Sequence, residues 1–239
     1  MKLKSIKKIK HESKRYDIEV ENFHNFFAND ILVHNCSMYP HKIHARSLDS
    51  GSHESRNYVK NIWAQMGYDI PQGWRLCGEN MFAKHALYYT NNPVEFNAGD
   101  SINPRMEKYP GGNALKTYFY AFSLWDDKNY SLDWDETLEY LELLGIEPCP
   151  VIYRGIWDME VIEKLNKFIE KNPDLIEGYV VRINERYHYS QFKKMNGKYV
   201  RKNHVISNHG HWMSKKVTKN ELRKEGSYNW RDKISSILK

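Results

Sequence analysis

Charge separates this chain into a basic start, an acidic middle and a basic end. Residues 1–15 carry seven Lys or Arg and one Glu, whereas residues 16–35 carry four acids and no Lys or Arg. Residues 36–190 hold 16 basic and 22 acidic groups, and residues 191–239 hold 13 basic and three acidic groups. A uniformly basic domain is therefore excluded. The chain has two separate basic arms on an acidic body, and each arm requires its own partner.

The remaining composition limits the class of protein. The chain has 239 residues, enough for one ordinary domain with a small module or for two small domains. Its 41% of hydrophobic residues can fill a core, which excludes wholesale disorder. No apolar run approaches the roughly 18 residues that cross a bilayer, and no apolar block follows the N-terminal lysines as in a secretory signal. Three scattered cysteines make neither a disulfide framework nor a zinc cage, so we expect a reduced, cytoplasmic protein with no membrane partner.

The segment that leads to Cys36 has a strand pattern and a reactive end. Its pattern predicts two short strands, a turn and an apolar strand, over Tyr16–Glu21, Asn25–Ala28, Asn29–Asp30 and Ile31–Val33. The Asn35 side-chain amide can attack its own backbone carbonyl and cut the chain, while the His34 imidazole moves protons. The Cys36 thiol can receive an acyl group. The alternative interpretation is an edge hairpin that happens to end in His34-Asn35-Cys36. The tripeptide by itself would not argue against that interpretation.

The whole block closely resembles the C-terminal splicing motifs of inteins. The matching residues are Tyr16-Asp-Ile-Glu-Val, His24-Asn-Phe-Phe, and Val33-His-Asn before Cys36. The resemblance implies a small all-β Hint-type fragment over residues 1–35. It also implies that Asp17 and His24 assist acyl transfer, that His34 is the penultimate histidine, that Asn35 cyclises, and that Cys36 is the first residue after the splice junction.

A complete intein has well over a hundred residues and begins with its own nucleophile, and that first half is missing here. The resemblance therefore implies either a naturally split intein, whose N-terminal half is a separate chain, or a truncated gene. The basic arm over residues 1–15 favours the split form, because an acidic partner would be attracted to it over a long range. A solvated basic tail without a partner is the alternative.

From Cys36 onward the pattern predicts an α+β body with antiparallel strands. We expect strands or hairpins over Cys36–Ser47, Gly73–Met81, Leu115–Trp125, Glu177–Ile183 and Phe192–Val205. We expect helices over Ser52–Met66, Asp133–Leu144 and Asp158–Asn172. An Asp133/Glu136 capping pair opens the second of these helices.

Five blocks in this body resemble ATP-dependent RNA ligases of the covalent nucleotidyltransferase superfamily. The blocks are Ala45-Arg46-Ser47, Cys77-Gly78-Glu79-Asn80, Phe119–Trp125, Glu177–Arg182 and Gly197–Lys202. The resemblance extends from residue 36 to about residue 215 and implies ATP-grasp-like antiparallel sheets with helices. It leaves residues 216–239 as a basic C-terminal tail.

The resemblance also implies ATP, Mg²⁺ and a role for each matching residue. Phe122 stacks on adenine, with Tyr120 as the alternative, and Glu79 binds the ribose. Glu177 holds the metal near the phosphate. Lys198, with Arg201 or Lys202, neutralises the α-phosphate and the leaving pyrophosphate, and Arg46 binds a terminal 5′-phosphate. Many of these ligases have an acid after the stacking Phe, where this chain has Ser123, so the register of the adenine site stays open.

The nucleophile of this family is absent from the chain. The family motif Lys-x-Asp-Gly precedes the Arg46 strand, and residues 1–60 contain no such motif. The predicted split intein thus interrupts the enzyme at its catalytic lysine, which we expect on the partner chain. Only 37 residues follow Lys202, which is too few for the OB-fold of DNA ligases and capping enzymes.

These observations predict a precursor that is spliced in trans to its N-terminal half and becomes an RNA ligase. The product would join a 5′-phosphate to a 3′-hydroxyl through a lysyl-AMP intermediate, with RNA ends as partners, and the unspliced chain would be inactive as a ligase. Two alternatives remain, a DNA-type polynucleotide ligase and an inactive ligase fold that binds RNA.

Overall fold

The computed structural model describes ten stretches of the chain. They are residues 3–9, 15–20, 27–28, 31–32, 36–44, 54–84, 87–96, 107–109, 112–201 and 218–227. Before Cys36, and in residues 94–96 and 107–109, the description is of the backbone only. The chain combines antiparallel sheets with helices, in agreement with the predicted α+β class. None of the helices within these stretches is long and apolar enough to cross a membrane.

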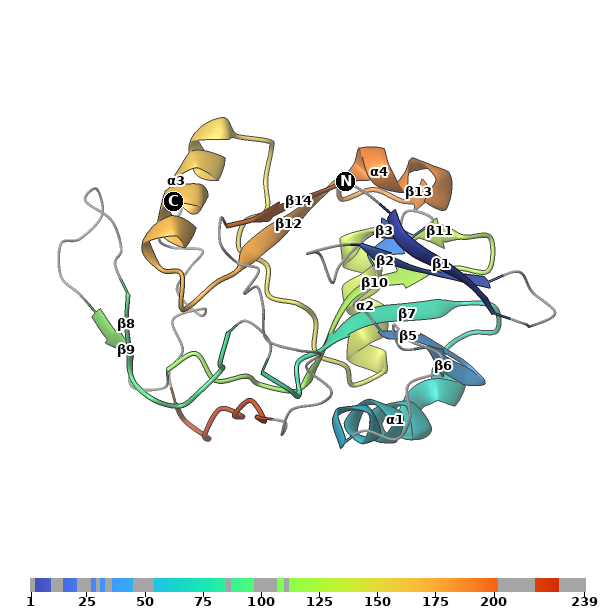
Figure 1. Ribbon diagram of the computed structural model, residues 1–239, viewed down its shortest axis with the longest axis horizontal. Coiled ribbons are helices and arrows are strands. Elements are labelled where there is room, and N and C mark those ends of the chain that lie inside the picture. Colours follow the sequence, from blue (N-terminus) through green and yellow to red (C-terminus); the bar gives the residue numbers. More distant parts are fainter. Residues whose placement is uncertain are drawn as a thin grey trace.

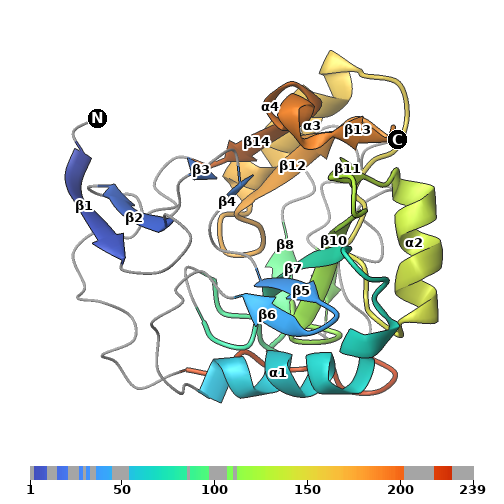
Figure 2. The same ribbon diagram turned by 90° about the vertical axis from the view of Figure 1, so that its right-hand side faces the viewer.

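The N-terminal segment contains two small antiparallel pairs. Strand β1 (Leu3–Ile9) pairs with β2 (Arg15–Val20), and β3 (Phe27–Ala28) pairs with β4 (Ile31–Leu32). The strand expected from Tyr16 is therefore present, and the basic arm before it forms a strand that the sequence analysis did not predict. Figure 2 shows the β1–β2 hairpin apart from the main sheet.

The main sheet has six strands and begins at Cys36. Its strands are β5 (Cys36–Tyr39), β6 (Lys42–His44), β7 (Arg75–Asn80), β10 (Phe119–Trp125), β11 (Tyr130–Ser131) and β13 (Tyr187–His188). Their order across the sheet is β13-β11-β10-β7-β5-β6, and all pairs are antiparallel (Figure 1). Cys36 lies opposite Gly78, so the first residue after the predicted splice junction already belongs to this sheet.

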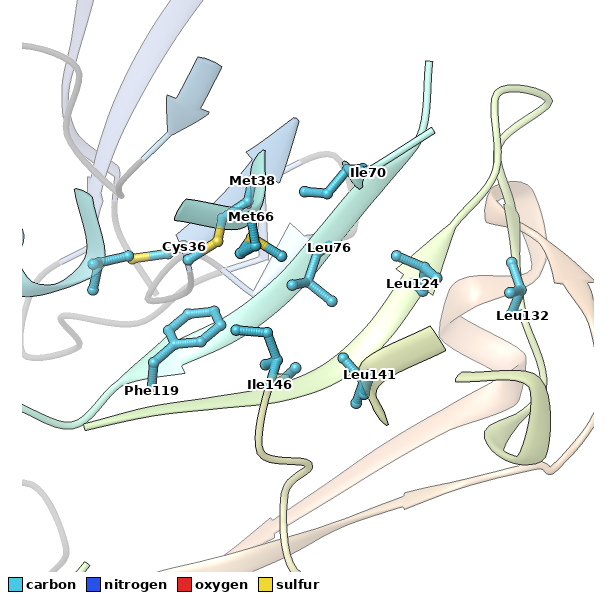
Figure 3. Packing of buried hydrophobic residues seen from close by; sticks show 12 residues of the cluster. Cys36, Met38, Met66, Ile70, Leu76, Phe119, Leu124, Leu132, Leu141 and Ile146 are labelled. Carbon is cyan, nitrogen blue, oxygen red and sulfur yellow. The ribbon is translucent and has the colours of Figure 1, made fainter. Parts of the chain in front are cut away.

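Two helices cover one face of the six-stranded sheet and form the core with it. They are α1 (Glu54–Met66), which leads into the short helix η1 (Gly67–Asp69), and α2 (Trp134–Leu143). The core side chains include Met38, Leu76 and Leu124, each fully buried (Figure 3). The predicted Asp133/Glu136 capping box is present at the start of α2, because Asp133 Oδ1 accepts from the Glu136 N–H at 2.9 Å.

A separate two-stranded sheet packs on a third helix. Strands β12 (Gly178–Arg182) and β14 (Asn196–Val200) pair with each other, and α3 (Met159–Lys171) lies on one face of them (Figure 1). Tyr179 and Tyr199 stack on that face with ring centroids 5.2 Å apart. Lys198 lies opposite Val180, and by alternation it belongs to the other face of this two-stranded sheet. A further pair, β8 (Val94–Phe96) with β9 (Glu107–Tyr109), completes the strands.

Two predicted strand boundaries are wrong. Residues 189–195 form the short helices η2 (Tyr189–Gln191) and α4 (Phe192–Met195), so the strand expected from Phe192 begins only at Asn196. The helical turn is closed at Asn196, whose side-chain NH₂ donates to the Phe192 carbonyl at 2.9 Å, and the Phe192 ring packs against Trp125 with centroids 6.1 Å apart. Strand β10 begins at Phe119 rather than at Leu115, because the backbone of Leu115 pairs with residues 221–223 instead.

Candidate active site

The face of the main sheet away from the core carries two of the predicted nucleotide-binding residues. Glu79 lies directly opposite Tyr120, and paired residues in antiparallel strands point to the same face. Their neighbours Gly78 and Ala121 belong to the core face. The Glu79 side chain reaches solvent, and the Tyr120 hydroxyl accepts a hydrogen bond from the Lys116 N–H at 2.8 Å.

A β-bulge changes the backbone next to these residues. The register of β10 on β7 shifts between Ala121 and Ser123, so Phe122 is the extra residue and stands outside the ladder. Its carbonyl instead accepts a hydrogen bond from Arg182 Nη1 at the end of β12. The Arg182 guanidinium also lies 4.8 Å from the centre of the Trp134 ring. Through this hydrogen bond the bulge joins the main sheet to the β12–β14 sheet.

Charged groups from three distant segments act on one another between these two sheets. The pKa of Glu79 is raised, first because surrounding protein desolvates the carboxylate and second because Glu177 is also negative, while Lys198 lowers it. The pKa of Glu177 is likewise raised by burial, and the Leu87 backbone N–H, Lys198 and Arg201 act in the opposite direction. The site therefore holds two carboxylates with raised pKa values, the solvent-facing Glu79 and the half-buried Glu177, and their neighbours include cations.

Glu177 is held in place by backbone contacts as well as by charge. The Leu87 N–H donates to its carboxylate, and its own carbonyl accepts from the Arg201 N–H at 3.1 Å. Residue 201 directly follows β14 and Glu177 directly precedes β12, so the pairing of these two strands brings Arg201 beside Glu177.

The carboxylates are the groups here that could hold a metal ion. Within the described stretches, three or more His, Cys, Asp or Glu side chains do not gather in the manner of a protein-only metal site. Mg²⁺ usually keeps several waters and takes only one or two carboxylates together with substrate phosphates. The pair Glu79 and Glu177 fits that smaller requirement, since the two carboxylates lie near enough for the negative charge of Glu177 to raise the pKa of Glu79.

Cys36 lies at the start of β5 inside the core. It is 7% exposed and packs in the cluster that contains Met38 and Phe119 (Figure 3). Burial, and to a smaller extent the charge of Glu79, raises the pKa of its thiol to about 11. Cys149 is similar, because burial raises the pKa of that thiol to about 12. All three cysteines are free, and these two remain protonated thiols near neutral pH.

The structure brings together some of the predicted residues and does not reach others. Charge interactions link four of the predicted residues, Glu79, Glu177, Lys198 and Arg201. Phe122 lies on the strand beside that of Glu79. Asp17 lies on β2 with its backbone opposite Lys7. His24, His34, Asn35, Arg46 and Lys202 lie outside the described residues. Ser123, which directly follows Phe122, accepts a hydrogen bond from Trp125 Nε1 at 3.0 Å and is buried.

The sequence analysis assigned no role to Arg182 or to the Leu87 backbone. Arg182 belongs to the block Glu177–Arg182, and its position at the end of an apolar strand was a usable signal. A charged side chain there must be paired if it is buried. The contribution of Leu87 is a backbone N–H, which no side-chain pattern can reveal.

Comparison with known proteins identifies the family. Residues 21–202, about three quarters of the chain, match the RNA ligase family, and the chain belongs to it. Membership supports a ligase-like function. The match starts upstream of Cys36, so the boundary at residues 35 and 36 depends on the splice motif alone.

A short stretch also resembles another enzyme. Over 38 residues the chain is 60% identical to DNA topoisomerase 1 of Pyrococcus furiosus, and this match covers 16% of the chain and 4% of that protein. No solved structure matches the chain.

Proposed function

We propose that residues from Cys36 onward are the larger part of an ATP-dependent RNA ligase. The observation that carries the proposal is the meeting of Glu79, Glu177 and Lys198 in a chain of the RNA ligase family. These residues come from β7, from the position just before β12 and from β14, so only the folded domain brings them together. Perturbed carboxylates beside a lysine are typical of a catalytic site.

The reaction requires a lysine amine to attack the α-phosphorus of ATP. The bond from this phosphorus to the bridging oxygen of the β-phosphate breaks, and pyrophosphate leaves. The adenylate then passes from the lysine to the 5′-phosphate of an RNA end. The 3′-hydroxyl of the second end attacks that phosphate, and AMP leaves. Charge develops on phosphate oxygens at each step, and fixed cations stabilise it.

Different residues of this chain bind different parts of ATP. Phe122 or Tyr120 stacks on the adenine from the exposed face of β10, and Glu79 binds the ribose from the neighbouring strand. Lys198 and Arg201 neutralise the phosphates, and Arg46 binds the 5′-phosphate of the RNA. Glu177, with Glu79 nearby, would hold Mg²⁺, which supplies further neutralisation of the phosphate charge.

The proposed split intein accounts for the absence of the attacking lysine. In the described part of residues 1–35, β1 pairs with β2 and β3 with β4, the sequence then reaches His34-Asn35, and the main sheet begins at Cys36 with β5. We infer that the N-terminal half carries the Lys-x-Asp-Gly motif and joins this chain at Cys36.

Two other functions remain as alternatives. A DNA-type polynucleotide ligase would use the same ATP site, and competition between RNA and DNA ends for the adenylated product separates it from the RNA ligase. An inactive ligase fold that binds RNA is favoured by one observation, the lack of a Lys-x-Asp-Gly motif in the chain. It predicts that no partner restores adenylation.

We expect the isolated full chain to bind ATP and Mg²⁺ without forming covalent AMP. Lys198→Ala should weaken ATP binding at least about tenfold, because a charge-assisted phosphate contact is lost. Lys128→Ala is the matched control, since Lys128 is an exposed lysine on the turn after β10. Titration calorimetry measures the affinities, and α-labelled ATP detects covalent AMP. A covalent adduct on the isolated chain would contradict the missing-lysine proposal, and equal affinities for the two variants would contradict the site.

The splicing proposal has its own test. After mixing with an N-terminal half, Asn35→Ala should block release of residues 1–35 while acyl transfer to Cys36 continues, so a branched intermediate should accumulate. Asn29→Ala, in the predicted turn, is the matched control and should splice normally. Mass spectrometry of the products distinguishes these forms. Normal spliced product from Asn35→Ala would show that Asn35 is not the cyclising residue.

A further inference from the structure

Residues 218–227 lie beyond the family match and are tightly bonded to the domain. Asn220 is 2% exposed, and its backbone N–H donates to the Phe82 carbonyl at 2.9 Å. Its side-chain NH₂ donates to the carbonyls of Met81 at 2.8 Å and Ala83 at 3.1 Å. Its side-chain oxygen accepts from the Tyr89 N–H at 3.1 Å. Part of the span predicted as a tail is therefore built into the fold (Figure 1, red segment).

Glu221 makes a denser set of contacts with the segment Tyr88–Asn91. One carboxylate oxygen accepts from the Asn91 N–H at 2.7 Å, from Thr90 Oγ1 at 3.1 Å and from Asn91 Nδ2 at 3.2 Å. The other accepts from the Tyr88 hydroxyl at 3.0 Å. The Glu221 backbone N–H also donates to the Tyr89 carbonyl at 2.8 Å. These donors hold the pKa of Glu221 below its usual range, and the Asn91 N–H has the largest effect. The Glu221 carboxylate is therefore ionised near neutral pH.

The segment that Glu221 holds leads directly to the candidate active site. Leu87 immediately precedes Tyr88, is buried, and donates its backbone N–H to the Glu177 carboxylate. The residues that Asn220 holds begin at Met81, two positions after Glu79. Asn220 thus fixes the stretch that follows Glu79 in the chain. Glu221 fixes the stretch that follows Leu87, the donor to Glu177.

We propose that Glu221 is a positioning residue of this enzyme, which fixes the Tyr88–Asn91 segment so that the Leu87 N–H holds the Glu177 carboxylate in place. The inference rests on the proposed ligase function for the role of Glu177. The physical reason is that a carboxylate with several protein donors restrains its donors in return, and supporting contacts of this kind keep a site in its productive geometry. Glu221 acts through the segment and touches neither ATP nor RNA in this account.

The test compares three variants of the full chain. Glu221→Ala removes the carboxylate, and Glu221→Gln keeps one acceptor oxygen and should partly rescue. Glu225→Ala is the matched control, because Glu225 is an exposed acid in the same segment. We expect amide hydrogen exchange at Leu87 to accelerate at least about tenfold in Glu221→Ala, with protection of α3 unchanged. ATP binding in the presence of Mg²⁺ should weaken about fivefold in the same variant and not in the control.

The outcomes separate the inference from the function on which it rests. Unchanged Leu87 exchange in Glu221→Ala would overturn the inference. Faster exchange with ATP affinity equal to that of the control would make Glu221 structural only and would also overturn it. A wild-type chain that binds no ATP would contradict the proposed function, while the Leu87 exchange alone still decides whether Glu221 restrains the segment. If Glu221→Ala folds poorly, Tyr88→Phe removes one donor and gives the same comparison with a smaller change.

Discussion

At the scale of a single residue, Gly78 shows how tightly the main sheet is packed next to the candidate site. It lies in β7 between Cys36 of β5 and Ala121 of β10, one position before Glu79. A Cβ atom at this position would lie 2.3 Å from Phe119 Cζ and 2.7 Å from the Tyr120 carbonyl oxygen. Phe119 is 1% exposed, so its ring has little room to move. The absence of a side chain at residue 78 therefore permits the packing beneath the candidate site.

We expect Gly78→Ala to lower the free energy of unfolding by about 1–3 kcal/mol, because overpacking forces side chains or backbone to shift. Gly197→Ala is the matched control, since nothing lies within 4 Å of a Cβ atom built there. A change at such an open position should stay within about 0.5 kcal/mol. Urea denaturation followed by tryptophan fluorescence measures both values. Equal unfolding free energies for the two variants would mean that the sheet adjusts freely at Gly78.

At the scale of elements, the local pattern of the sequence was a good guide to helices and hairpins. Helices α1 and α3 were predicted from apolar spacing, and α2 was predicted from the Asp133/Glu136 capping pair at its start. Strand β12 also lies where its apolar run predicted it. These elements depend on residues that are near one another in the chain, and their pattern is therefore visible in the sequence.

The elements that were missed depend on contacts between distant parts of the chain. The start of β14 was misplaced in the segment where Phe192 packs on Trp125, and β10 was drawn too long because Leu115 pairs with residues 221–223. The bulge at Phe122 and its contact with Arg182 join residues 60 positions apart. Glu221 contacts residues about 130 positions away. Such pairings leave no periodic signal, so sequence blocks could propose Glu79, Glu177 and Lys198 but not the residues that support them.

At the scale of the whole molecule, the two proposed activities of the chain make opposite demands on Cys36. Splicing needs this thiol as an exposed nucleophile at the junction. The folded ligase domain instead places it in β5, paired with Gly78 and buried beside Met38 and Phe119. Burial raises the pKa of the thiol to about 11, so near neutral pH the fraction present as thiolate is very small. The folded core therefore protects Cys36 from reaction.

We expect Cys36 in the folded chain to react with iodoacetamide far more slowly than Cys77, which is only half-buried on the other face of the sheet. The two rates should converge in denaturing urea, because unfolding exposes both thiols. Peptide mapping by mass spectrometry assigns the modified residue. If the proposed splicing takes place, slow labelling of Cys36 would mean that acyl transfer to this thiol precedes the docking of β5. Labelling of Cys36 in the native chain as fast as in urea would contradict its burial and would remove this constraint on the order of events.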